Sequence, residues 1–386
     1  MPGFEVIGDE EKKAVMEIFE KDNGVLFAHG FAGARNGVYR VRDFENKVKF
    51  FIGTKYAQAV SSGSAALYTA LKAMGIKPGD EVITQSFTFV ATVEAIIEVG
   101  AVPVICDIDE TLNLDPDDFE RKITPKTKLV IPVHMAGVCA KMDRIMEIAN
   151  ANNLPVLEDA AQAFGCTFQG HKVGTIGDAA IFSFDFGKTI TCGEGGMIVT
   201  NNDDIFFEAR CFHDHGHEYD MSVSRGIDPC HSHGFNFRMT EMQAAVASVQ
   251  LQKLDFIVSQ QRKNKAKLKE GLSKLPIRFR SLPDENGEIA DTLFFFVENS
   301  KIAKKIVEKL NSDGLHTKNV PDALKWHFAG YWDHMIKQYY KQPLMDVFSK
   351  SWSILEKTVS LPIWVKDDND WLDNYIKSVS GFFKGL

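Results

Sequence analysis

The chain has 386 residues and is 45% hydrophobic, so it can bury a sizeable core, and its length predicts two or three lobes. Its formal net charge is -8, with lysine and arginine spread along the chain, which excludes the electrostatic footprint of a nucleic-acid or anionic-membrane binder. Small molecules are the expected partners.

The first residues lack the basic and apolar segments of a secretory signal, because Pro2-Gly3-Phe4-Glu5 is followed shortly by the charged stretch 9–13. No apolar run reaches the roughly eighteen residues that a membrane helix needs. The six cysteines show no CxxC spacing, which suits a reducing compartment. We therefore expect a cytoplasmic protein with no membrane partner.

Residues 56 to 200 alternate short apolar runs with segments of helical period, a rhythm typical of βαβ units around a mostly parallel sheet. Strands are predicted at 56–60, 81–84, 102–107, 128–133, 156–158, 179–184 and 196–200. Helices are predicted at 10–20, 65–74, 90–98, 116–123 and 142–152. A long amphipathic helix after Thr240 then leaves this lobe. The expected organisation is an N-terminal segment (1–30) packed with the small domain, a large domain (31–254) and a smaller α+β C-terminal domain (255–386).

Ligands in doubly wound sheets bind beyond the carboxyl ends of the strands, so the residues just after each strand are the candidates. After the first strand, Ser61 to Ala66 form a small-residue turn that opens a helix, where free N–H groups and the helix dipole favour a phosphate. The same turn could serve only as a helix cap. After the strand at 156, Asp159 is either an N-cap or a carboxylate that keeps a protonated ring nitrogen cationic.

The most specific stretch is 183–196, in which Lys188 stands among small and apolar residues between a strand end and a glycine-rich return. A poorly solvated amine in such a loop is a usable nucleophile. The alternative is an ordinary lysine at a loop tip. Further along, Asn236 and Arg238 are polar residues held between aromatics, which indicates either a structural role or contact with a ligand.

Histidines at 213, 215, 217, 231 and 233 are candidate metal ligands. No carboxylate-rich motif accompanies them, so we predict no metal site. A substrate-facing loop fits better, with Arg225 and Arg238 available for a carboxylate or phosphate of the substrate.

Taken together, these stretches resemble the sugar aminotransferases of the DegT/DnrJ/EryC1/StrS family over nearly the whole chain. The resemblance implies the α/β PLP-transferase fold of type I, with a mixed, mostly parallel sheet in the large domain, and pyridoxal 5'-phosphate (PLP) as cofactor. The family's Schiff-base lysine maps to Lys188 and its acidic residue at the pyridine nitrogen to Asp159. Its other cofactor contacts map to Gly63, Ser64, Phe89, Gln162 and Ser183.

The family's Gly-Tyr-Asn-Tyr-Arg-Met segment is similar to residues 234–239, and in the family its Asn reaches the phosphate in the neighbouring subunit's site. Asn236 therefore implies a homodimer with shared active sites. A dehydrating branch of the family has His in place of the lysine. Lys188 instead implies transfer of an amino group, with L-glutamate as donor, to a keto or aldehyde sugar.

Four segments resemble, more narrowly, the enzymes that form 8-amino-3,8-dideoxy-manno-octulosonate, an amino variant of a lipopolysaccharide core sugar. These segments are Met1–Glu5, Val133–Met135, Lys188–Gly196 and Asp214–His217. The loop 219–232 and much of the small lobe depart from that pattern. The expected acceptor is then 3,8-dideoxy-8-oxo-manno-octulosonate, and a nucleotide-linked keto-hexose is the alternative. The candidate substrate contacts are His134, His215, Arg225 and Arg238.

Two other classes of protein are alternatives to an aminotransferase. A nicotinamide dehydrogenase needs GxGxxG after the first strand, which Ser61 to Ala66 do not provide. A non-catalytic PLP-binding regulator usually carries a DNA-binding or partner module, and the sequence contains no basic segment of that kind. The sequence therefore favours an enzyme that acts on a sugar.

Overall fold

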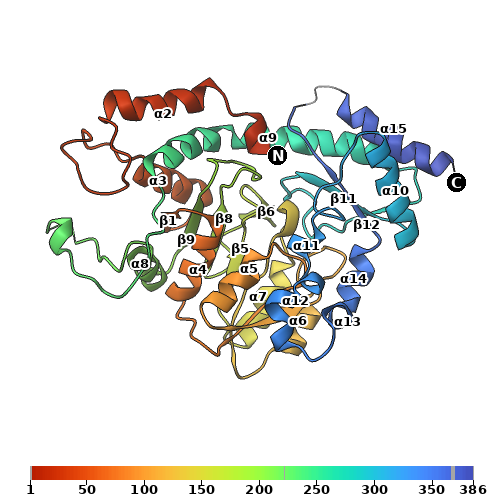
Figure 1. Ribbon diagram of the computed structural model, residues 1–386, viewed down its shortest axis with the longest axis horizontal. Helices are drawn as coiled ribbons and strands as arrows, with labels where there is room; N and C mark the ends of the chain where they lie inside the picture. The colour runs from red at the N-terminus through yellow and green to blue at the C-terminus, as the bar shows by residue number, and fades with distance from the viewer. Residues whose placement is uncertain (1, 221, 367–369, 386) are drawn as a thin grey trace.

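The computed structural model describes residues 2–220, 222–366 and 370–385; Met1, the first residue of one segment singled out above, lies outside these ranges. Figure 1 shows a large lobe built around a sheet and a smaller lobe at the other end of a long helix. Within the described ranges, no helix is both long and apolar enough to cross a membrane.

The central sheet of the large lobe has the order β1-β9-β8-β5-β4-β2-β3. Its strands are β1 (Tyr56–Val60), β2 (Glu81–Gln85), β3 (Val102–Cys106), β4 (Thr127–Val130), β5 (Leu157–Asp159), β8 (Ala179–Ser183) and β9 (Gly196–Thr200). Two parallel bridges, Val130 to Val156 and Val133 to Asp159, join its two halves. Only β9 runs antiparallel to its neighbours β1 and β8. The predicted mixed, mostly parallel sheet is confirmed.

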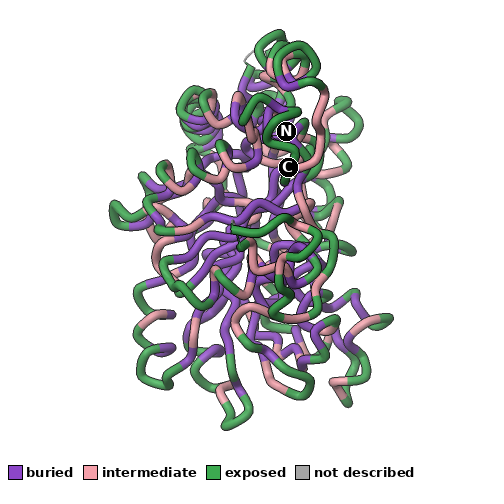
Figure 2. The backbone as a smooth tube through the Cα atoms, turned by 90° about the vertical axis from the view of Figure 1, so that its left-hand side faces the viewer, coloured by how far each residue is buried: buried purple, intermediate pink, exposed green. Residues whose placement is uncertain are grey.

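Helices cover both faces of this sheet because successive strand residues point to opposite sides. Ile181 faces one apolar cluster and Phe182 the other. The helices of the large lobe are α3 (Arg40–Ile52), α4 (Gly63–Ala73), α5 (Ala91–Glu98), α6 (Pro116–Lys122), α7 (Met142–Ala151) and α8 (Asp203–Phe212). Figure 2 shows the strands as a buried layer through the middle of the molecule, with exposed segments at the rim.

Helix α9 (Glu241–Leu272) connects the lobes as one continuous element (Figure 1). It begins with a capping box in which the Thr240 hydroxyl accepts from the Gln243 backbone N–H. The predicted domain boundary at 254/255 falls inside this helix, so no loop separates the two lobes at that point. A helix that contributes to both cores holds them together more firmly than a linker would.

The small lobe contains an antiparallel sheet, β10-β11-β12, packed on α10 and α15. The bounds are β10 (Arg278–Phe279), β11 (Thr292–Phe296), β12 (Thr358–Pro362), α10 (Ser300–Ser312) and α15 (Trp371–Lys384). Short helices fill the space below it: α11 (Leu324–His327), α12 (Asp333–Ile336), α13 (Leu344–Val347) and α14 (Ser349–Leu355). Apolar residues of these helices and of the turns between them, Phe328 and Trp332 among them, pack against Phe87 of the large lobe.

The N-terminal segment contains α1 (Pro2–Glu5) and α2 (Asp9–Lys21), and it lies along α9. Lys253 of α9 donates to Glu11 at 2.9 Å. The segment touches the small-lobe side through Glu5, whose carboxylate accepts from the N–H groups of Val365 and Lys366. The segment also contacts the large lobe, because Gly3 N donates to Lys188 O at 3.2 Å. A small hairpin, β6 (Thr167–Phe168) and β7 (His171–Lys172), was not predicted.

Candidate active site

The carboxyl ends of β1 and β8 meet at the small-residue turn that precedes α4. Ser62 caps α4 by accepting from Ala65 N at 3.0 Å, so the helix begins at Gly63, two residues earlier than predicted. A side chain at Gly63 would lie 2.8 Å from Ser183 Cβ. Only glycine therefore lets the helix N-terminus approach Ser183, and the free N–H groups of Gly63 and Ser64 and the Ser183 hydroxyl form one concave cradle.

Asp159 ends β5 and is 3% exposed. Its carboxylate accepts from the Thr92 hydroxyl at 2.8 Å and from Ala161 N at 3.1 Å. Burial raises the pKa of Asp159, against the lowering effect of these two bonds. Across the described ranges it has no lysine, arginine or histidine within ion-pair distance, so a cationic ring nitrogen would supply the partner that this buried carboxylate lacks.

Lys188 lies in the turn after β8, with 17% of its side chain exposed. Its backbone N–H bonds to Asp185 O at 3.1 Å, and its Nζ is 3.4 Å from the Asp185 carboxylate. Its charge lowers the pKa of two buried groups, Asp159 and His327, which places it near both. The structure thus brings the lysine and the acid of the sequence analysis to one site.

His327 and Trp326 lie beside the candidate site residue Phe89, and the sequence analysis did not single them out. The Thr88 and Val90 N–H groups bond to the carbonyls of His327 and Trp326, both at 2.9 Å, which fixes α11 against the start of α5. Phe89, predicted to stack on a cofactor ring, is 40% exposed and is itself flanked by Trp326 and His327, with ring centroids 6.3 and 5.4 Å away.

His327 Nδ1 lies 2.9 Å from the carbonyl of Ala323, so Nδ1 carries the proton and Nε2 is left as an acceptor. Burial lowers the pKa of His327, and the charge of Lys188 lowers it further, which keeps the ring neutral. The signal that could have found it is a lone polar ring within the aromatic run from Trp326 to Trp332. His327 does not follow a strand of the first lobe, so the rule that ligands bind at strand ends does not point to it.

Gln162 and His134 lie in the segments that follow β5 and β4. Gln162 Oε1 accepts from Ala136 N at 2.8 Å. His134 requires a correction: its ring is fully buried, Nε2 bonds to Glu158 at 3.0 Å, and Nδ1 accepts from Ala140 N at 3.1 Å. Both ring nitrogens are therefore used inside the protein, and His134 offers none to a substrate.

The loop 213–238 also differs from expectation. The carboxylate of Asp214 is fully buried and accepts from Arg225 at 2.6 Å and from the Tyr219 hydroxyl at 2.6 Å, and it pairs with Arg238. Burial opposes the charge of Asp214, but the bonds from Arg225 and Tyr219 hold its pKa well below its usual range. Both arginines expected to bind substrate are thus committed to this internal carboxylate.

The two remaining candidates of this loop face outward. His215 and Asn236 are exposed. Phe237 O accepts from Ser61 N at 2.7 Å, so the strand-like segment with Asn236 runs beside the cradle turn. Within the described residues, no group of three or more His, Cys, Asp or Glu side chains could hold a metal ion.

These features fit PLP: an anion cradle at the start of α4, a buried carboxylate without a cation, and a partly buried amine in the turn after β8. A match to the model of the DegT/DnrJ/EryC1/StrS aminotransferase family covers residues 33–380. The chain is 33% identical to the spore coat polysaccharide biosynthesis protein SpsC of Bacillus subtilis, over 98% of this chain and 96% of that protein. It is 44% identical to GDP-perosamine synthase of Caulobacter vibrioides over 219 residues, 55% of this chain and 56% of that one.

Solved structures agree. The aminotransferase from Psychrobacter cryohalolentis superposes with a TM-score of 0.86 at 27% identity, covering 98% of both chains. A 3-amino-5-hydroxybenzoic acid synthase superposes with a TM-score of 0.85 at 26% identity, covering 98% of this chain and 97% of the other. The fold and site define a PLP-dependent aminotransferase of fold type I. The chain belongs to the DegT/DnrJ/EryC1/StrS aminotransferase family, whose members use PLP.

Proposed function

We propose that this enzyme moves the amino group of L-glutamate to C8 of 3,8-dideoxy-8-oxo-manno-octulosonate, in the cytoplasm, and so forms the 8-amino sugar for lipopolysaccharide. One contact supports this acceptor. Gly3 N donates to Lys188 O, and a side chain at Gly3 would lie 2.9 Å from Thr191 N. Residues 2–5 and 188–196, which belong to two of the segments that resemble octulosonate aminotransferases, are thus packed together at the lysine.

Each residue has a proposed role. Lys188 holds PLP covalently between turnovers, and its freed amine moves the proton from the α-carbon of the donor. Asp159 keeps the ring nitrogen protonated, and bound PLP supplies the electron sink for the deprotonated carbon. Gly63, Ser64 and Ser183 bind the phosphate. Phe89 stacks on the ring, and Gln162 lies beside the ring hydroxyl.

Asn236 is proposed to bind the phosphate of the partner subunit in a homodimer. Its exposure on a single chain leaves the amide free to do so. Phe235, next to it, is 50% exposed. Packing on a second subunit would remove this apolar ring surface from water, which favours dimer formation.

A GDP-linked keto-hexose is the second candidate acceptor, because the chain is 44% identical over 219 residues to an enzyme named for GDP-perosamine. That similarity spans little more than half of either chain.

A competition between acceptors tests the proposal. The PLP-loaded enzyme is given L-glutamate with either 3,8-dideoxy-8-oxo-manno-octulosonate or a GDP-linked keto-hexose, and 2-oxoglutarate release and the mass of the amino product are followed. We expect kcat/KM to favour the octulosonate by about a hundredfold or more. The reverse preference would replace the octulosonate by the nucleotide sugar. Release of 2-oxoglutarate in a single turnover without either acceptor checks the donor separately.

A further inference from the structure

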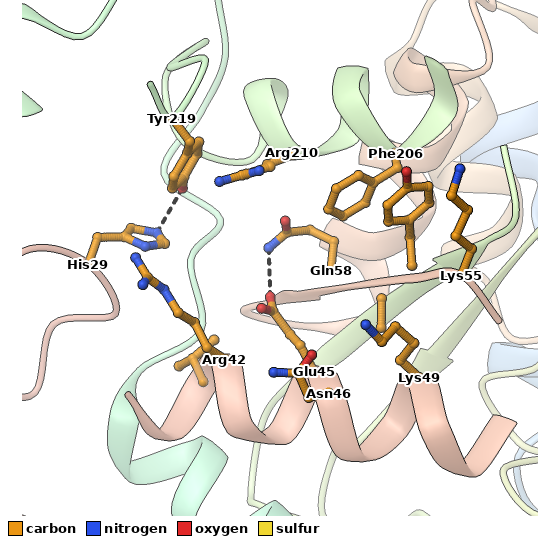
Figure 3. A pocket seen from close by; sticks show the side chains of 13 residues that line it. His29, Arg42, Glu45, Asn46, Lys49, Lys55, Gln58, Phe206, Arg210 and Tyr219 are labelled. Atoms are coloured by element: carbon orange, nitrogen blue, oxygen red, sulfur yellow. Dashed lines mark hydrogen bonds between the residues drawn. The ribbon is translucent and has the colours of Figure 1, made fainter. Parts of the chain in front are cut away.

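A pocket of about 250 Å³ lies at the outer edge of β1, outside the site described above. Figure 3 shows α3 on one side, α8 on the other and β1 between them, with His29 and Tyr219 at one end. Gln58, near its centre, precedes Ser62, the N-cap residue just before the cradle, by four positions. At about 3.3 Å per residue, the pocket is roughly 13 Å from the cofactor-phosphate cradle.

The lining of this pocket is cationic. Arg42, Lys49, Lys55 and Arg210 line it, with Glu45 as the one carboxylate. Lys55 is already paired with Asp203 outside the pocket at 2.5 Å. For the other three cations, the described part of the chain provides no carboxylate within ion-pair distance. An uncompensated set of cations in a partly enclosed space attracts an anion strongly, because solvent screens it poorly.

Two of these cations are oriented by aromatic rings. The Arg42 guanidinium lies 4.1 Å from the ring centre of Tyr39, and the Arg210 guanidinium 4.4 Å from that of Tyr219. Stacking on a ring fixes the plane of a guanidinium and leaves its N–H groups free at the edge. Figure 3 shows Arg210 and Lys49 on opposite sides of Gln58.

Glu45 neutralises this set only in part. Its Oε1 accepts from Gln58 Nε2 and from Ala59 N, both at 2.9 Å, so the carboxyl is bound to the strand. Burial raises the pKa of Glu45 to about 7. The carboxyl is therefore partly protonated near neutral pH, and its second oxygen can then donate to an anion.

We propose that this pocket binds a phosphate or diphosphate group of a small molecule, separately from the cofactor. At about 30 Å³ per water the pocket holds roughly eight waters, a size comparable to the nine non-hydrogen atoms of a diphosphate. Two guanidinium groups and an ammonium are the side-chain donors that proteins use to bind the oxygens of such a group.

A bound anion also connects Tyr219 and α8 to β1. Gln58 Nε2 lies 3.1 Å from His213 Nε2, and the Tyr219 hydroxyl bonds to Asp214 at the base of the 213–238 loop. Binding therefore stabilises the folded chain, and with it the loop that carries Asn236.

Calorimetric titration of the PLP-loaded enzyme with inorganic phosphate and with inorganic pyrophosphate tests the proposal. The loaded cofactor fills the cradle, so neither probe can bind there. The matched variants are Lys49→Gln, inside the pocket, and Lys47→Gln, on the exposed face of the same helix α3. Arg210→Gln provides a second variant in the pocket from another helix.

We expect one saturable site per chain, weakened about tenfold by Lys49→Gln and by Arg210→Gln and changed less than about twofold by Lys47→Gln. The tighter of the two probes identifies a monophosphate or a diphosphate as the group bound. The proposal is overturned if neither probe saturates, if all three variants weaken binding equally, or if binding survives both pocket variants. The readout needs no turnover, so it is independent of the sugar acceptor.

Discussion

At the carboxyl ends of β5 and β8, two charged residues have weak internal partners. Asp159 has a hydroxyl and one backbone N–H, and Lys188 has a carboxylate 3.4 Å away. In the 213–238 loop the opposite holds, because Asp214 is bonded to two arginines and a tyrosine. Both regions carry an aspartate and basic residues after an element of the large lobe.

The difference separates function from structure. A buried charge without a strong partner is costly for the free protein, and the cost is offset when a ligand supplies the partner. A buried charge surrounded by its own counter-ions has nothing left to offer a ligand, and its removal leaves those counter-ions unpaired. We therefore expect mutations in the first region to change chemistry and mutations in the second to change stability.

Lys188→Ala should show the largest effect. Turnover should fall by about a thousandfold or more, because nucleophile and proton carrier are removed together. The measurement is the glutamate half-reaction followed by 2-oxoglutarate release. Lys128→Ala, an exposed lysine of β4, is the matched control. Turnover within about tenfold of wild type would contradict the assignment of Lys188.

Asp159→Asn and Asp214→Asn should behave as opposites. Asp159→Asn should lower turnover by about a hundredfold without loss of stability, since a neutral amide is cheaper to bury than a carboxylate. Asp214→Asn should lower the free energy of unfolding by about 3 kcal/mol, because Arg225 and Arg238 lose their buried partner. Urea unfolding and activity are measured on both proteins. If Asp159→Asn unfolded more easily and Asp214→Asn did not, the distinction between the two regions would be lost.

Asn236→Asp should inactivate the enzyme, because the new carboxylate repels the cofactor phosphate. Mixing this variant with a second inactive variant tests whether residue 236 contacts the phosphate in its own subunit or in the partner subunit. In a one-to-one mixture with Lys188→Ala, a heterodimer has one site with both defects and one with neither. Activity should then recover to about a quarter of wild type. Subunit exchange is verified by native mass spectrometry. No recovery after proven exchange would place Asn236 in its own subunit's site or outside any site.

His213 gives a smaller, pH-dependent effect. Burial lowers the pKa of His213 to about 4 from its ordinary 6.5. Between these values the unfolded chain binds more protons than the folded one, so stability is lost as pH falls below about 6.5. At about pH 5 His213→Gln should recover on the order of 2 kcal/mol of this loss, relative to its effect at about pH 7.5. Urea unfolding at both pH values measures the free energy of unfolding of each protein. An equal recovery of stability by His171→Gln, at an exposed histidine, would contradict the role of His213.

The sequence by itself did not predict α3 and α8, but it determined the strands of the large lobe, helices α4 to α7 and the position of Lys188 and Asp159 after two of the strands. This was possible because these features depend on local patterns: apolar period, caps such as Asp115, and residues that directly follow a strand. The sequence also indicated the family, since Gly63, Asp159 and Lys188 are each part of a short local motif.

Only the tertiary structure decided which polar groups remain free. Both ring nitrogens of His134 are hydrogen-bonded, to Glu158 and Ala140, and Arg225 pairs with Asp214. His327 came to the site from a helix of the other lobe, through backbone bonds to the segment around Phe89. The physical reason is that hydrogen bonding and burial depend on neighbours in space, and residues distant in the chain supply those neighbours.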